Sequence, residues 1–312
     1  QHRAYRMSSK LKSKPEFADR TWRYFVISVP YVWLLVFFFI PFLFVFKISF
    51  SDPIIAQPPF TPLFDWSKDS FDVFLGTLDN YRFLTEDNLY WLSYLKSARV
   101  AAISTLLCLL LGYPMAYGIA RAESTIRNLL LLLVILPFWT SFLLRVYAWM
   151  GMLSTHGVIN NMLMWIGLID QPLRLLYTDF AVYMGIVYTY LPFMILPLYA
   201  NLERLDLSLH EAAADLGARP FQVFRDVTIP MSLPGIIAGC LLVFIPALGE
   251  YVIPALLGGV DSLMIGRTLY NEFFLHRDWP LASAVATVLL FILVIPMMVF
   301  QKYQVTTSDG PE

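Results

Sequence analysis

An acidic side chain stands in the middle of a segment that is otherwise apolar enough to cross a membrane. Glu250 lies beside Tyr251 and between Pro246 and Pro254. Because proline inside a helix removes a hydrogen bond and clashes with the preceding turn, we expect the helix to be broken here. A carboxylate at membrane depth is costly and marks a functional site by default. Glu250 is therefore the leading candidate for a residue that contacts a substrate.

Glu250 also has a structural interpretation, as one half of a buried ion pair. Arg145 stands well inside an earlier apolar segment, 128–153, and Arg267 follows the segment that holds Glu250. A paired guanidinium would compensate the buried carboxylate. Both interpretations stay open at the level of the sequence.

A second stretch of interest, residues 209–230, is polar although it lies between two apolar segments. Glu211–Leu216 consists mostly of strong helix formers. Gly217 follows where a helix would end in the left-handed conformation, and Pro220 suits the first turn of a new helix. We therefore expect a helix, a tight glycine turn and a second short helix.

The second of these helices should carry an apolar surface. Phe221 and Phe224 are three residues apart and so share a helix face. Together with Leu216 they are expected to form an apolar knob that faces the cytoplasm.

The residue types needed for bond chemistry are missing. His210 and Glu211 begin like a zinc-protease motif, but Ala214 stands where the second histidine would be required. Cys108 and Cys240 fall inside apolar runs, where they are expected to be small buried hydrophobes. No phosphate-binding loop with a Gly-Lys-Ser/Thr ending occurs, so ATP would have to bind to another protein. We predict no catalytic residue, no metal ligand and no cofactor in this chain.

The composition indicates an all-α integral membrane protein. Of the 312 residues, 58% are hydrophobic and 14% are charged, against about 25% charged in a typical soluble domain. About 30 Å of hydrocarbon takes roughly 20 residues of helix. Six segments meet this requirement: Tyr24–Phe46, Val100–Ala120, Asn128–Leu153, Phe180–Leu202, Met231–Gly259 and Trp279–Gln301. No basic patch interleaved with aromatic residues points to nucleic acid, so lipid is the expected surrounding.

The positions of lysine and arginine predict the orientation in the membrane, because basic residues collect on the cytoplasmic side. Residues 1–23 carry seven of them and 121–127 carry two, whereas 154–179 carries one. Both termini are therefore expected in the cytoplasm. The predicted organisation is a basic tail 1–23, a six-helix domain 24–301 with an external loop 47–97 and a cytoplasmic loop 203–230, and a short tail 302–312.

The polar segment resembles the cytoplasmic EAA loop of ABC importer permeases. Glu211-Ala212-Ala213 is followed after three residues by Gly217, and after nine further residues by Val227-x-Ile229-Pro230. The family has Ile-x-Leu-Pro at that end, which is a conservative departure. The resemblance implies a type I ABC importer permease fold. It also implies that Glu211, Ala212, Ala213 and Gly217, with the knob of Leu216, Phe221 and Phe224, dock on an ATPase subunit. The alternative is an interfacial helix packed on the chain's own bundle.

Other stretches are similar to polyamine permeases. They are residues 136–151, 244–259, 264–274 and 277–284. The resemblance implies one permease subunit of an importer in the bacterial inner membrane, with putrescine expected rather than spermidine or another small solute. It implies a second, homologous permease, two copies of an ATPase that binds ATP and Mg, and a periplasmic polyamine-binding protein.

A polyamine would need carboxylates or aromatic faces for its ammonium groups, and a cation–π contact contributes about 0.5–2 kcal/mol. Besides Glu250 and Tyr251, the aromatic candidates for the pathway are Trp139, Tyr147, Trp149, Tyr188 and Tyr190, each of which could instead be packing. The acids Asp261, Glu272 and Asp278 could hold a cation at the external entrance or be simply solvated.

Two other classes of protein remain as alternatives. Proline-broken spans and a membrane carboxylate also suit an ion-coupled secondary transporter, although no internal repeat supports one. A membrane-embedded enzyme is disfavoured because the chain lacks a nucleophile with a base or a metal-ligand cluster.

Overall fold

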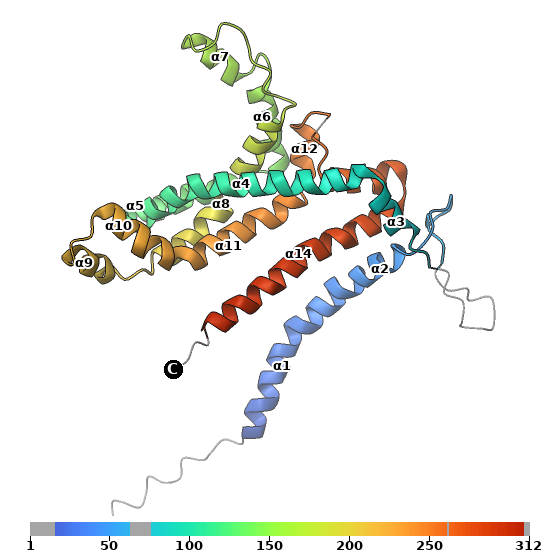
Figure 1. The fold of residues 1–312 in the computed structure, drawn as a ribbon, viewed down its shortest axis with the longest axis horizontal. Coiled ribbons are helices and arrows are strands. Elements are labelled where there is room, and N and C mark those ends of the chain that lie inside the picture. The colour runs from blue at the N-terminus through green and yellow to red at the C-terminus, as the bar shows by residue number, and fades with distance from the viewer. Residues whose placement is uncertain (1–15, 63–75, 261, 309–312) are drawn as a thin grey trace, which may run out of the picture. The chain divides into compact units, whose positions relative to one another are not determined.

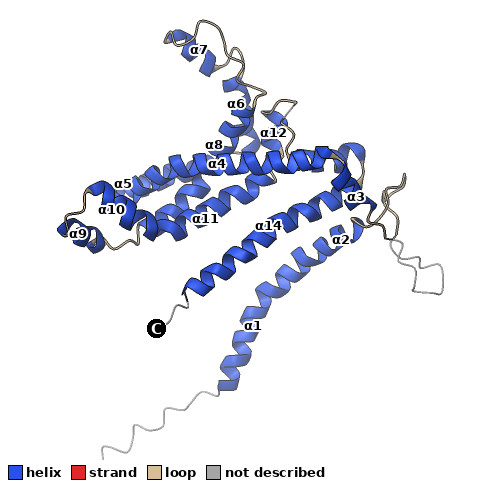
Figure 2. Cartoon of the chain, viewed as in Figure 1, coloured by secondary structure: helices blue, strands red, loops and turns tan. Residues whose placement is uncertain are grey.

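The computed structural model describes residues 16–62, 76–260 and 262–308. These ranges are helical apart from turns, loops and one isolated bridge between Pro53 and Phe60 (Figure 2). The prediction of an all-α protein is confirmed for this part of the chain. The ends of both predicted tails, the centre of the predicted external loop and Asp261 lie outside the described residues.

Two compact units make up the chain, and each is described by itself. The first comprises residues 1–80 with 279–287, and the second comprises 81–278 with 288–312.

The first unit contains the first apolar segment. Helix α1 (Glu16–Leu34) continues through a π-helical turn (Leu35–Phe39) into α2 (Ile40–Ile48). The π-helical turn ends two residues before Pro41, which has no N–H to continue the regular ladder. The apolar run Val26–Ile48 is long enough to cross a membrane, so the first expected span is present with its boundaries shifted by two residues.

Three long helices form the core of the second unit: α4 (Asn88–Arg121), α8 (Asp179–Leu202) and α11 (Ile229–Leu248) pack against one another (Figure 1). Cys108, Met194 and Val243 are fully buried at their meeting point. The helices approach closely because α11 presents glycine there: a Cβ on Gly239 would lie 2.7 Å from the Met194 sulfur. Small residues allow such close packing in membrane bundles.

The third expected span, Asn128–Leu153, is not one helix. Helix α5 (Ser124–Ile135) runs into a 3₁₀ turn (Leu136–Trp139), and α6 (Phe142–Leu153) follows after two non-helical residues. The two helical parts are bent by 92°. Pro137 lies in the 3₁₀ turn and interrupts the α-helical ladder. The sequence predicted one span over Asn128–Leu153, and the structure divides this segment by a sharp bend.

The break expected in the fifth span is confirmed. Helix α11 ends at Leu248, and a short helix, α12 (Val252–Leu256), begins after Glu250 and Tyr251. The remaining helices are α3 (Asp79–Glu86), α7 (Val158–Trp165), α9 (Ser208–Asp215), α10 (Pro220–Val223), α13 (Ile265–Tyr270) and α14 (Trp279–Ser308), with π-helical turns at Phe224–Thr228 and Asn271–His276.

The predicted external loop 47–97 contains more helix than expected. Helix α4 starts at Asn88 and not near Val100, so its first three turns were assigned to the loop. Two serines in those turns bond to α13, and the Thr268 hydroxyl donates to the Ser93 hydroxyl at 3.3 Å. The Ser97 hydroxyl accepts the N–H of Ile265 at 2.7 Å.

The described residues hold four helices long and apolar enough to cross a membrane, or five if the bent pair is one span. They are Val26–Ile48, Asn88–Arg121, Asp179–Leu202 and Pro220–Leu248, with Ser124–Trp165 as the bent pair. The sixth expected span begins at Trp279 as predicted, but its apolar described part, Trp279–Val294, is shorter than the others. The structure therefore supports four or five spans where the sequence predicted six.

Candidate functional site

The Glu250 carboxylate closes the break between α11 and α12. Its Oε1 atom accepts the backbone N–H groups of Tyr251, Val252 and Ile253 at 3.2, 3.0 and 3.4 Å. These are N–H groups at the start of α12, which have no partner inside a helix. The carboxylate therefore caps the short helix, and its negative charge is favoured by the positive end of the helix dipole.

The other carboxylate oxygen is bound from a neighbouring helix. The Tyr190 hydroxyl, on α8, donates to Glu250 Oε2 at 2.5 Å. Glu250 is only 8% exposed, so in this conformation both oxygens face protein groups. Tyr190 and Glu250, two candidates separated by 60 residues in the sequence, are thus brought together.

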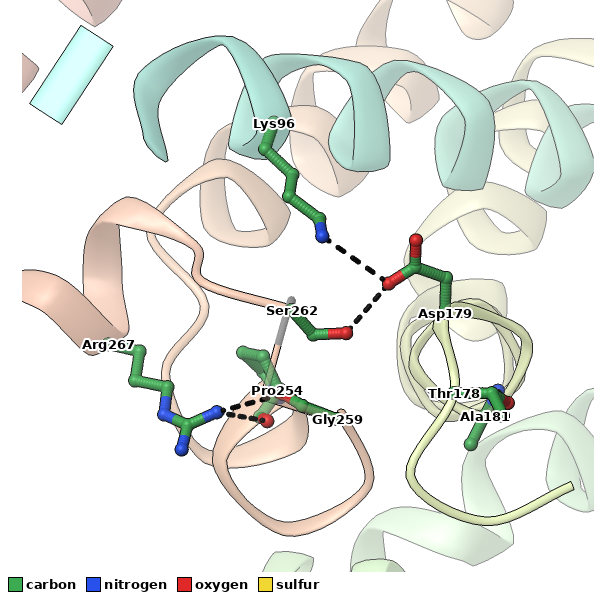
Figure 3. Close-up of polar contacts among 8 residues, drawn as sticks. All are labelled: Lys96, Thr178, Asp179, Ala181, Pro254, Gly259, Ser262 and Arg267. Carbon is green, nitrogen blue, oxygen red and sulfur yellow. Dashed lines mark hydrogen bonds and ion pairs between the residues drawn. The ribbon is translucent and has the colours of Figure 1, made fainter. Parts of the chain in front are cut away.

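The ion pair that the sequence left open is not formed in this structure. Arg267 donates to the carbonyl oxygens of Pro254 and Gly259 at 3.5 and 3.4 Å (Figure 3). The Arg145 guanidinium lies near the rings of Phe138 and Phe142, and its Nε and Nη1 atoms are buried without a hydrogen-bond partner among the described residues. Glu250 is held by a tyrosine and backbone N–H groups, with no described arginine as its partner.

The aromatic candidates other than Tyr190 divide into three groups. The Tyr251 ring stacks on Tyr270 at 4.1 Å, and Tyr270 contacts Phe274 at 4.6 Å, so a row of rings leads away from the break. Trp139 is 73% exposed and Tyr147 is also exposed, on the two sides of the sharp bend. Among the described residues, no hydrogen bond or ring contact joins these two rings to Glu250. Trp149 and Tyr188 pack on each other at 5.5 Å.

Gly266 contributes to the break and was missed by the sequence analysis. A Cβ at this position would lie 2.4 Å from the Gly249 carbonyl oxygen and 2.7 Å from that of Glu250. The start of α13 can therefore approach the broken segment only because residue 266 has no side chain. The glycine itself was the available signal, but the sequence does not say which backbone it meets.

Of the three acids proposed for an external entrance, Glu272 is buried and not solvated. Its carboxylate accepts the Tyr90 hydroxyl at 3.0 Å and lies 2.9 Å from Nδ1 of His276. The Asp278 backbone N–H donates to the Glu272 carbonyl oxygen. Glu272 therefore joins α4 to the π-helical turn before α14, which makes it a structural group.

The segment 203–230 folds as the sequence predicted. Helix α9 ends at Asp215, and Gly217 adopts a φ of 85°, the left-handed conformation expected at a helix C-terminus. The N–H groups of Gly217 and Ala218 donate to the last carbonyls of α9. Pro220 then begins α10.

The predicted apolar knob is smaller than expected. Leu216 is 90% exposed and Phe221 is 71% exposed, so both offer apolar surface to a partner. Phe224 instead packs edge-on against Tyr113 and Tyr117 of α4, with ring centroids 5.7 and 5.9 Å apart. Phe224 anchors the segment to the bundle and does not belong to the exposed surface. Among the other candidates, Glu211 and Ala212 are exposed and Ala213 is half-buried.

Further contacts fix this segment on the long helices. His210 Nε2 lies 2.9 Å from the Thr228 hydroxyl, which joins α9 to the turn before α11. Arg127 forms an ion pair with Glu203, the first residue of the segment, at 2.9 Å. Hydrogen bonds from the backbone and the side chain of Ser208 lower the pKa of Asp206, so this acid is ionised at neutral pH.

Two features of the second unit therefore stand out, the broken segment and the helix–turn–helix, and the described residues hold no cluster of side chains that could bind a metal ion. The broken segment is held by hydrogen bonds that an incoming group could replace. The exposed helix–turn–helix is anchored firmly at Phe224 and His210, so a force applied to it would reach α4 and α11.

The part of the chain that holds both features matches a known protein family. Residues 108–306 match the family described as binding-protein-dependent transport system inner membrane component. This match includes the broken segment and the whole helix–turn–helix.

Individual relatives match over most of the chain. The spermidine/putrescine transport system permease protein PotB of Escherichia coli (strain K12) is 42% identical over 272 residues, which cover 86% of this chain and 93% of the relative. The PotB protein of Haemophilus influenzae is 40% identical over 276 residues, covering 88% and 92%. A crystal structure of a bacterial ABC transporter for the acidic polysaccharide alginate has a chain with 19% identity and a TM-score of 0.64, covering 92% of this chain and 98% of that chain. Because the identity of this last match is low, the match supports the fold alone.

Proposed function

Because this chain belongs to the family of binding-protein-dependent transport system inner membrane components, we propose that it is the permease subunit of an ATP-driven importer of spermidine and putrescine. The substrate class is supported by relatives that are 40–42% identical over most of both chains. These relatives are spermidine/putrescine permeases, so they favour a shared polyamine specificity over the narrower putrescine specificity expected from the sequence. The chain is a transport component of the bacterial inner membrane and not an enzyme.

The observation that carries the coupling role is the exposed apolar surface of Leu216 and Phe221 on an anchored helix–turn–helix. We propose that it docks in a cleft of the ATPase subunit, with Glu211, Ala212 and Ala213 on the docking helix and Gly217 at its end. Two ATPase copies would bind ATP and Mg, a second homologous permease would complete the pathway, and a periplasmic binding protein would deliver the polyamine. ATP binding would shift the equilibrium between the outward- and inward-facing conformations only as far as ATP binds one of them more tightly than the other.

In the proposed orientation, segment 203–230 and both termini lie in the cytoplasm. The bent pair α5–α6 and the helix α14 then each count as a crossing, which makes six. The basic residues of 1–23 and 121–127 support this orientation.

We place the substrate pathway at the broken segment. An ammonium group of a polyamine would replace the Tyr190 hydroxyl at Glu250 Oε2, since a charged donor binds a carboxylate more strongly than a neutral one. In this proposal the Tyr190 hydroxyl occupies Glu250 Oε2 as long as no substrate is bound, and it holds the broken segment against α8. Tyr251 would offer a ring face beside it, and the exposed rings of Trp139 and Tyr147 would face the second permease.

Uptake into vesicles tests the proposal. The vesicles contain this chain, the neighbouring permease, the ATPase and the binding protein, and uptake of labelled putrescine and labelled spermidine is measured with and without ATP. We expect both to be taken up only with ATP and each to compete with the other. Uptake driven by an ion gradient without the ATPase would identify a secondary transporter. ATP-driven uptake of a different solute would retain the importer and reject polyamines.

A further inference from the structure

A half-polar cavity of about 420 Å³ lies between α4 and α8. Two basic side chains enter it from α4, and an acid and a tyrosine enter it from the first turns of α8. The residues that line it include Leu92, Leu95, Lys96, Arg99, Asp179 and Tyr183. No part of the transport proposal uses this cavity.

The acid of the cavity already has partners. Lys96 Nζ lies 3.6 Å from Asp179 Oδ1, and the Ser262 hydroxyl donates to the same carboxylate at 2.7 Å (Figure 3). Arg99 has no hydrogen-bond or ion-pair partner among the residues that the structure describes. Two cations therefore stand against one carboxylate, and the cavity carries an excess positive charge.

Arg99 lies in an apolar stripe. Leu92, Leu95, Leu106 and Leu110 are exposed and recur at helical spacing with Arg99 along one face of α4. An arginine on such a face is costly in lipid unless its guanidinium meets a polar or anionic group at the membrane surface. The 34 residues of α4 extend about 50 Å, well beyond the hydrocarbon layer. Arg99 lines the same cavity as Asp179, which is the first residue of α8. A position beside the start of a membrane helix is consistent with the depth of the lipid headgroups.

We propose that this cavity binds the phosphate of an anionic phospholipid. Arg99 and Lys96 would hold the phosphate, the Tyr183 hydroxyl would donate to it, and the acyl chains would lie along the leucine stripe. Guanidinium and ammonium groups both bind phosphate through charge-assisted hydrogen bonds. The inference requires only a membrane location, and in the orientation proposed above the lipid would belong to the outer leaflet.

Native mass spectrometry can test the site. The full chain, with the subunits that co-purify with it, is titrated in neutral detergent with phosphatidylglycerol, and phosphatidylcholine or inorganic phosphate serves as the comparison. We expect one phosphatidylglycerol to be retained and Arg99→Gln to weaken its binding about fivefold, as removal of one basic residue at a membrane surface predicts. Arg99→Lys keeps the charge and should bind almost as well as the parent.

Arg82→Gln is the matched control, because Arg82 is an exposed arginine of α3 that already pairs with Glu86. Its lipid binding should be unchanged. The proposal is overturned if Arg99→Gln binds like the parent, or if phosphatidylcholine or free phosphate binds as well as phosphatidylglycerol. Loss of a co-purifying permease in place of the lipid would identify a protein contact instead. Should Arg99→Gln fail to accumulate, the salt dependence of binding by the parent decides, and affinity independent of salt rejects the proposal.

Discussion

Glu250 accepts hydrogen bonds from three backbone N–H groups and from the Tyr190 hydroxyl. The carboxylate therefore caps a helix, and in the proposed pathway it would also offer a charge to the substrate. Glu250→Gln separates these two roles. The amide keeps one oxygen for the backbone N–H groups but removes the charge. Hydrogen bonds to charged groups contribute about 1.5–3 kcal/mol, so polyamine uptake, measured as kcat/KM, should fall about ten- to a hundredfold while the complex still assembles.

Glu272→Gln provides the control, since Glu272 is a second buried carboxylate with a tyrosine partner. It should leave uptake per assembled complex close to that of the parent. Normal uptake by Glu250→Gln would reject the pathway role. A complex that no longer assembles would show that Glu250 is needed mainly to cap α12.

Gly266 is a further residue on which the break depends. In Gly266→Ala the new Cβ would meet the Gly249 carbonyl oxygen at 2.4 Å, so the backbone must move. Overpacking of this kind costs about 1–3 kcal/mol, and we expect a lower thermal unfolding temperature together with reduced uptake. Gly118→Ala in α4 has nothing within 4 Å of the added Cβ and should not destabilise the protein. Equal stability of the two variants would contradict the role of Gly266.

At the scale of elements, the sequence predicted those features that depend on one or two neighbouring residues. Gly217 and Pro220 predicted the helix–turn–helix because the left-handed turn and the helix start depend on those residues alone. The start of α4 was missed because Ser97 is polar in sequence but buried against Ile265. The burial of Glu272 by Tyr90 was missed for the same reason. Long-range partners decide such cases, and one sequence does not contain them.

Phe221 and Phe224 show this difference within one short segment and give a matched pair of variants. Phe221 is exposed, so Phe221→Ala should change unfolding stability by less than about 0.5 kcal/mol but weaken ATPase binding by about 2 kcal/mol if it is an anchor. Phe224 packs on Tyr113 and Tyr117, so Phe224→Ala should cost about 3 kcal/mol of stability. Thermal unfolding and co-purification of the ATPase measure the two effects. If neither variant loses ATPase binding, the proposed docking surface is rejected.

At the scale of the whole molecule, the coupling proposal depends on which side of the membrane each exposed segment occupies. Leu216 must face the cytoplasm to reach an ATPase. The bent pair, Ser124–Trp139 and Phe142–Trp165 with its 92° angle, leads from the proposed cytoplasmic connection 121–127 to α8. If this pair crosses the membrane, Trp165 lies outside and Leu216 lies inside. If it turns back, the two positions exchange sides and the docking surface would be external.

Single cysteines at these two positions distinguish the arrangements. In a background with Cys108→Ala and Cys240→Ala, Leu216→Cys and Trp165→Cys place thiols at residues that are 90% and 86% exposed. A membrane-impermeant maleimide should label Trp165→Cys on the outer face of the inner membrane, and Leu216→Cys only after the membrane is permeabilised. The reverse pattern would mean that α5–α6 is re-entrant. Since only the first pattern lets the helix–turn–helix meet a cytoplasmic ATPase, the labelling also decides whether ATP could drive this chain through residues 203–230.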